Sequence, residues 1–77
     1  MQKVQSVILN KDSFTLEQAC NWILKNNFQI KKIDSTLNTF RFRQYSPQAL
    51  RKEGYNNYRT VSITPNAQLV IAYSKQS

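Results

Sequence analysis

Residues Asn38 to Tyr45 read N-T-F-R-F-R-Q-Y, a run in which two phenylalanines alternate with two arginines. Successive side chains of a β-strand point to opposite faces, so Phe40 and Phe42 would share one face while Arg41 and Arg43 share the other. The aromatic face can close a hydrophobic core, and the guanidinium face can stay positive and solvated. This stretch therefore predicts a sheet strand with one buried and one open face.

Strand and helix patterns lie upstream of this run. Phe28 to Ile33 alternates apolar and polar residues and predicts a strand. The turn formers of Asp34 to Asn38 would join it to the phenylalanine and arginine strand as an antiparallel hairpin. Leu16 to Asn26 carries apolar residues at helical spacing, and Lys3 to Leu9 is a β-branched run typical of a strand.

End signals bound two expected helices. Thr15 followed three residues later by Gln18 predicts a capping box at the start of the first helix. Asn26-Asn27 suits a left-handed exit at its end. Ser46 to Gly54 has a Ser cap, Pro at the first helical position and Gly just past the end, which predicts a short second helix.

The C-terminal third predicts a second hairpin. Tyr55 to Asn57 is expected as a link, followed by strands over Tyr58–Thr64 and Ala67–Tyr73 that turn at Pro65-Asn66. The whole order predicts an α+β fold: a small antiparallel sheet of four to five strands, one main helix packed on one face and a second short helix. We expect one domain over residues 1–77, with residues 74–77 frayed.

Composition restricts the class of partner. Eleven Lys and Arg against four Asp and Glu leave a net charge of +7, which favours an anionic partner. No apolar run reaches the roughly 18 residues of a membrane span, and the N-terminus lacks a signal-length hydrophobic region. The single Cys20 cannot form an internal disulfide. We therefore expect an intracellular protein of the cytoplasm or nucleus, with no membrane partner.

Enzymatic activity is not expected. The chain has no His, which is the commonest general base and metal ligand, and its one glycine excludes a glycine-rich phosphate loop. Cys20 lies on the apolar stripe of the first helix, where a small buried side chain is the simpler interpretation. The four carboxylates are scattered at turns and helix ends. The sequence predicts no catalytic residue, metal site or cofactor.

The positive charge is concentrated in the middle of the chain, where eight of the eleven cations fall between residues 25 and 59. Arginine can bind phosphate through two hydrogen bonds and can also stack on a base, and tyrosine rings beside a basic surface suit stacking on unpaired bases. The predicted nucleic-acid-binding residues are Arg41, Arg43, Lys31, Lys32, Arg51, Lys52, Arg59, Tyr45 and Tyr58. Tyr55 borders the same region.

Plainer interpretations of these residues stay open. Arg41 and Arg43 can be the solvated face of an amphipathic strand, and the tyrosines can pack with their hydroxyls at the surface. Arg59 shares a strand face with Val61 and Ile63, so a structural role is equally compatible with its position. The N-T-F-R-F-R-Q-Y strand lacks the glycine and the second aromatic spacing of RNA-recognition modules. Sequence-specific reading of duplex DNA has no support.

The combined motifs resemble those of a family of short proteins encoded by tailed phages and large DNA viruses. The residues that carry the resemblance are Gln5-Ser6-Val7, Phe14-Thr15-Leu16-Glu17-Gln18-Ala19, Trp22, Phe28, Lys32-Ile33-Asp34-Ser35-Thr36-Leu37-Asn38, Arg41-Phe42-Arg43-Gln44, Pro47 and Tyr58-Arg59-Thr60. The resemblance implies a viral origin and a link to the virion or the packaged genome. It brings no catalytic residue with it.

Two functions are therefore expected as rivals. The first is a small basic viral module that binds nucleic acid non-specifically through a basic sheet face, with affinity from phosphate contacts. The second is a virion-associated or capsid-associated module that docks onto another viral protein or forms a homodimer through a strand edge.

Overall fold

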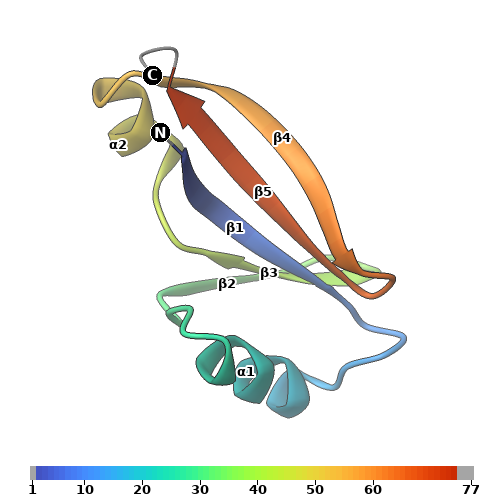
Figure 1. Cartoon of the computed structure of the whole chain (residues 1–77). Helices are drawn as coiled ribbons and strands as arrows, with labels where there is room; N and C mark the ends of the chain where they lie inside the picture. The colour runs from blue at the N-terminus through green and yellow to red at the C-terminus, as the bar shows by residue number, and fades with distance from the viewer. Residues whose placement is uncertain (1, 75–77) are drawn as a thin grey trace.

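The computed structural model describes residues 2–74, in which five antiparallel strands form one sheet with two helices (Figure 1). The elements are β1 (Gln2–Asn10), α1 (Leu16–Lys25), β2 (Lys32–Ser35), β3 (Thr39–Arg43), α2 (Pro47–Lys52), β4 (Tyr55–Thr64) and β5 (Ala67–Ser74). The strand order across the sheet is β2-β3-β1-β5-β4, and every neighbouring pair is antiparallel. The α+β fold expected from the sequence is confirmed.

The main core lies between α1 and the face of the sheet that carries the phenylalanines. Phe42 pairs with Val7 and Phe40 pairs with Leu9 across β3 and β1. These four side chains cluster with Ala19 and Ile23, two residues from the apolar stripe of α1. Phe42 is fully buried, so the alternation in β3 places its aromatic half in the core as expected.

A β-bulge in β1 lets two valines reach the same core. Val4 and Val7 are three residues apart, and regular alternation would put them on opposite faces. The register of β1 against β5 shifts between Val4 and Ser6, which leaves Gln5 as the extra residue. This bulge restores Val4 to the face of Val7, where it packs against the main core cluster. No local pattern in the sequence signals it.

The ends of α1 follow the predicted signals. The Thr15 hydroxyl accepts from the Gln18 backbone N–H at 3.2 Å, and the Gln18 side chain accepts from the Thr15 N–H at 3.0 Å, which completes the capping box. Asn27 has a positive φ of 66°, so the left-handed exit lies at the second asparagine. Gly54, with φ of 90°, ends the turn after α2.

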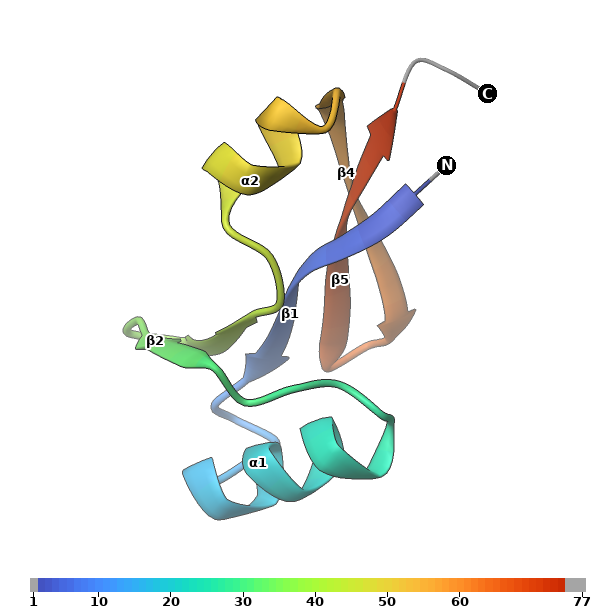
Figure 2. The same ribbon diagram turned by 90° about the vertical axis from the view of Figure 1, so that its left-hand side faces the viewer.

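The second helix packs on the other face of the sheet. Ala67 belongs to the α1 cluster, whereas Ala72 belongs to a second cluster with Leu50 of α2 and Tyr55. The two alanines are five positions apart in β5, and an odd spacing in a strand places them on opposite faces. Figure 2 shows α1 and α2 at opposite ends of the molecule. Each helix therefore covers only part of its own face.

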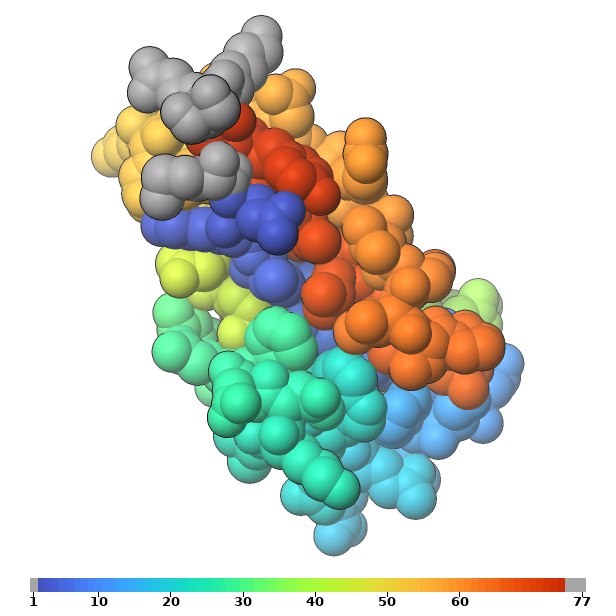
Figure 3. Space-filling view, viewed as in Figure 1, coloured from blue at the N-terminus to red at the C-terminus, as the bar shows by residue number. Residues whose placement is uncertain are grey.

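The space-filling view shows how much of the sheet α1 leaves uncovered. Side chains of β4 and β5 remain at the surface beside the helix instead of beneath it (Figure 3). β4 is an edge strand with most of its residues exposed, and its outer edge has no neighbouring strand among the described residues.

Two predicted boundaries are wrong. β2 begins at Lys32, not Phe28, because the side-chain amide of Gln44 occupies the backbone groups of Gln29 in place of a strand neighbour. β4 begins at Tyr55, so the segment expected as a link is strand. Ser74 ends β5, and the expected fraying of residues 75–77 lies outside the described residues.

Candidate nucleic-acid interface

The arginines of β3 lie on the sheet face opposite the main core. Arg43 pairs with Ser6 and Arg41 pairs with Ile8 on β1, one step out of phase with the phenylalanine pairs. Both arginines are partly exposed. The same face carries α2 at one end, so the arginines and the helix stand beside each other on one side of the sheet.

A hollow of about 520 Å³ opens between these elements, and we name it the arginine hollow. Its lining comes from β1, β2 and the turn after it, β3, α2 and β4. The lining residues are Gln5, Ser6, Asp34, Thr36, Arg41, Arg43, Pro47, Arg51 and Tyr58. Four of the predicted binding residues, Arg41, Arg43, Arg51 and Tyr58, therefore share one cavity although they span 18 residues of sequence.

Two polar residues held by hydrogen bonds contribute to this hollow from β1. The Ser6 hydroxyl donates to Gln5 Oε1 at 2.8 Å, and Gln5 Nε2 donates to the Tyr45 carbonyl at 3.3 Å. Both residues are buried. The short Ser6 side chain beside the long Arg43 leaves space over β1, because a large residue at this position would fill the hollow.

The electrostatic character of the hollow is positive. Three guanidinium groups face one carboxylate, and Arg43 Nη2 lies 3.9 Å from Asp34 Oδ2. This pair is partly exposed, with the two side chains 37% and 44% accessible, so its net contribution to stability is about 0–1 kcal/mol. Arg41 and Arg51 form no ion pair within residues 2–74. They can therefore bind an anion without first breaking an internal pair.

Tyr58 contributes an aromatic ring from β4, at the opposite edge of the sheet from β2. It lies on β4 opposite Ala72, and it is 46% exposed. β4 is three strands away from β3 in the sheet order, which places the two backbones about 14 Å apart at ~4.8 Å per strand. The arginines and the tyrosine therefore approach the hollow from opposite sides.

Two neighbouring depressions continue the basic surface. One, of about 330 Å³, contains Lys31, Lys32 and Tyr45 and shares Arg43 with the arginine hollow. The other, of about 420 Å³, contains Lys52 and shares Arg51 with it. We name these three linked depressions the basic track. Arg43 and Arg51 are the residues at which one depression passes into the next.

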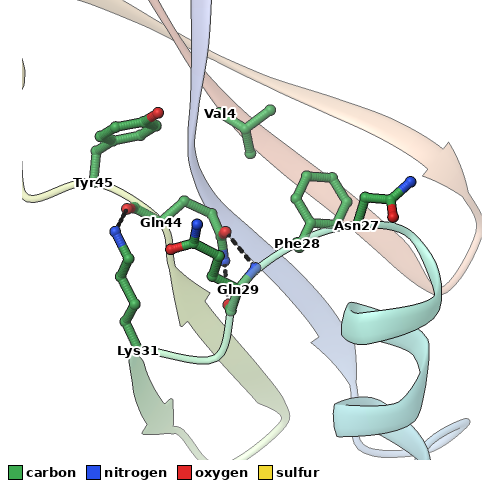
Figure 4. A pocket seen from close by; sticks show the side chains of 7 residues that line it. All are labelled: Val4, Asn27, Phe28, Gln29, Lys31, Gln44 and Tyr45. Carbon is green, nitrogen blue, oxygen red and sulfur yellow. Dashed lines mark hydrogen bonds between the residues drawn. The ribbon is translucent and has the colours of Figure 1, made fainter.

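A network of polar contacts positions Lys31 and Tyr45 (Figure 4). Gln44 accepts from the Gln29 N–H at 2.8 Å and donates to the Gln29 carbonyl at 2.7 Å, which fastens the segment before β2 to the end of β3. Lys31 Nζ donates to the Gln44 carbonyl at 3.3 Å and lies 5.6 Å from the centre of the Tyr45 ring. These contacts hold one end of the basic track in place.

Lys3 adds a second cation to this aromatic end. Its ammonium lies 4.9 Å from the centre of the Tyr45 ring and 5.4 Å from that of Tyr55. It also donates to the Glu53 carboxylate at 2.9 Å, and this hydrogen bond raises the pKa of Lys3 above its ordinary value of 10.5. Because Glu53 caps α2, the pair connects β1 to the end of that helix.

Arg59 is the one predicted binding residue that the structure separates from the others. It pairs with Ile71, and its guanidinium lies 5.9 Å from the centre of the Tyr73 ring. Adjacent residues of a strand face opposite ways, so Arg59 projects away from the side on which Tyr58 meets the hollow. The register of β4 therefore places Arg59 on the other face of the sheet from the arginine hollow.

Sequence reasoning did not include Gln5, Ser6, Asp34 and Thr36 in the site. Asp34 and Thr36 were interpretable only as turn formers, although the expected hairpin would have placed Asp34 near the arginines. No sequence pattern indicated that Gln5 and Ser6 would line the site, because their positions depend on the β1 bulge and on pairing with β3.

We also searched the described residues for metal-binding clusters and for helices that could span a membrane. Within residues 2–74 no three His, Cys, Asp or Glu side chains gather closely enough to hold a metal ion. Neither helix of the described chain has the length and apolar character needed to cross a membrane. Comparisons with protein-family models, with curated proteins and with solved structures found no match, so the proposals below rest on the residues of this chain alone.

Proposed function

We propose that this protein is a small, non-enzymatic module that binds nucleic acid non-specifically through the basic track. The observation that carries the proposal is the convergence of Arg41, Arg43 and Arg51 on one open hollow with a single opposing carboxylate. Guanidinium groups bind phosphate through two parallel hydrogen bonds. Eight of the nine residues predicted from the sequence line the track.

The charge of the track favours backbone contacts over base reading. Its cations come from β2, β3, α2 and the segment before β2, and α2, the helix on this face, has only six residues and packs on the sheet through Leu50. Phosphate contacts supply affinity and register but carry no sequence information. We therefore expect similar affinity for unrelated sequences and a strong dependence on salt.

The viral setting of this activity rests on the sequence resemblance alone and stays a prediction. An association with the packaged genome would give a nucleic-acid-binding module a direct role in the virion.

The test is a titration of fluorescently labelled oligonucleotides, followed by anisotropy across a salt series. Log affinity should fall linearly with log salt, and the double variant Arg41→Gln/Arg43→Gln should weaken binding at least tenfold and flatten the slope by about 1.4 for single strands. The matched control is Lys25→Gln/Arg59→Gln, which removes the same charge outside the track. Equal losses in the two variants would show that net charge, and not the track, drives binding.

A second candidate function is favoured by the exposed edge of β4. This edge strand runs for ten residues and carries only one charged side chain, Arg59. Unpaired strand edges bind other strands through main-chain hydrogen bonds. We propose as the rival that β4 pairs with another protein of the virion or capsid, or with β4 of a second copy in a homodimer.

Sedimentation velocity over a concentration series tests the homodimer. If β4 mediates dimerisation, the sedimenting mass should rise from the monomer value to the dimer value as the protein concentration increases. Ile63 is half-exposed on β4, and the Ile63→Lys variant should stay at the monomer value. A monomer at all concentrations would exclude self-association and leave only a different protein as the partner.

A further inference from the structure

We propose that the arginine hollow seats one unpaired nucleotide, whose base stacks on Tyr58 while Arg43 and Arg51 hold the phosphates on its two sides. This proposal rests on the proposed function and narrows its ligand to single-stranded nucleic acid. It assigns separate tasks to the aromatic and cationic residues of the same cavity.

The size and shape of the hollow support a single nucleotide. Its volume of about 520 Å³ falls in the range of about 300–1,000 Å³ that is typical of small-ligand sites. α2 stands on the sheet at one side of the hollow through Pro47 and Arg51, which makes the surface concave. A duplex presents a convex cylinder and cannot place a stacked, paired base inside such a cavity.

The arrangement of charge follows the repeat of a nucleic-acid strand. Arg43 and Arg51 each line the hollow and one neighbouring depression, so they mark its two exits along the basic track. A single nucleic-acid strand that runs through the hollow from Arg43 to Arg51 meets a cation, the Tyr58 ring and then a second cation. Phosphate, base and phosphate come in the same order.

Tyr58 is the residue suited to the base. The residue is almost half exposed, and no ring stacking or cation contact engages its ring within the described chain. Tyr45 differs, because Lys3 and Lys31 already lie over its ring. The residue across from Tyr58 on β5 is Ala72, whose short side chain is fully buried.

The experiment compares a labelled twelve-nucleotide oligo-dU, the same length of oligo-U and a twelve-base-pair duplex in one buffer. The expected result is at least tenfold tighter binding of the single strands than of the duplex. Tyr58→Leu should weaken single-strand binding about tenfold, as is typical for the loss of one stacked base, and leave duplex binding unchanged. Tyr58→Phe keeps the ring and should bind like the parent protein.

The matched control is Tyr73→Leu, which removes a ring that lies beside Arg59 outside the basic track and should change single-strand affinity less than threefold. Circular dichroism melting of each variant checks that the fold is retained. Equal affinity of DNA and RNA single strands fits the proposal, because its contacts engage phosphate and base faces only, whereas a tenfold preference for either would show that the sugar is read and overturn it in this form.

The failures of the two proposals are distinguishable. Duplex binding as tight as single-strand binding, or no loss in Tyr58→Leu, would overturn the single-nucleotide site while leaving phosphate binding by the arginines intact. No binding of any oligonucleotide at low salt would overturn the proposed function and this inference together.

Discussion

The two faces of β3 show two ways in which one short strand is constrained. On one face Phe40 and Phe42 are buried against Val7, Leu9 and α1. On the other, Arg41 and Arg43 border an open hollow, and within residues 2–74 their one ion pair joins Arg43 to Asp34 at 3.9 Å. Packing therefore specifies the phenylalanines closely, whereas strand geometry alone specifies the arginines. Substitutions on the first face should change stability, and those on the second should change binding.

Phe42→Ala should have the largest effect. Truncating a fully buried phenylalanine typically costs about 3–5 kcal/mol, which is comparable with the whole stability of a domain this small. We expect the variant to be largely unfolded at 25 °C in urea titrations followed by circular dichroism. Arg41→Ala on the opposite face should stay within about 0.5 kcal/mol of the parent protein. A cooperative Phe42→Ala transition at the parent's midpoint would contradict this difference between the faces.

Gln44→Ala should have the next largest effect, because it tests a polar residue at the boundary between the two faces. The substitution removes both hydrogen bonds to Gln29 and should destabilise the protein by about 1–3 kcal/mol. Hydrogen exchange measured by NMR should show lost protection at the Gln29 amide. The control is Gln68→Ala, whose exposed bond to Ser62 is 3.4 Å long. If the Gln29 amide stays protected in the Gln44→Ala variant, the Gln44 side chain does not hold the segment before β2 in place.

Asp34→Asn changes a charge on the arginine face and leaves the phenylalanine face unaltered. It removes the one carboxylate of the arginine hollow, so we expect nucleic-acid binding to tighten about threefold while stability changes by less than about 1 kcal/mol. Asp12→Asn makes the same charge change in the turn after β1 and should alter affinity less. Weaker binding in Asp34→Asn would contradict this expectation and would mean that the ion pair with Asp34 holds the Arg43 guanidinium in the orientation that binds nucleic acid.

The Lys3 and Glu53 pair should show the smallest effect. The pKa of Lys3 is raised in the folded protein, so its stabilisation is fully present below about pH 10.5 and is lost as pH rises through the folded pKa. Both side chains are partly exposed, and the expected change is small. Melting temperatures of the parent and Glu53→Gln should differ slightly at about pH 8 and converge near about pH 12. A gap that widens at high pH would contradict this linkage.

Local patterns predicted the elements well but not all of their edges. The alternation of β3, the capping box of Thr15 and the Ser46 to Gly54 signals all correspond to the structure. The start of β2 was wrong because a tertiary contact from Gln44 replaced a strand neighbour, and the start of β4 was wrong because Tyr55 packs with Leu50 and Ala72. Both effects depend on contacts between residues that are distant in sequence, Gln29 with Gln44 and Tyr55 with Ala72, which local patterns do not reveal.

Three features can be read from local sequence alone: the two-sided character of β3, the helix ends and the concentration of cations in the middle of the chain. These features follow from side-chain alternation, from local capping and from composition. Three others appear only in the folded chain: β1 lies between β3 and β5, a bulge falls at Gln5, and α2 packs on the arginine face. Those choices depend on contacts between distant segments, and they bring Tyr58 to the arginines while turning its neighbour Arg59 away.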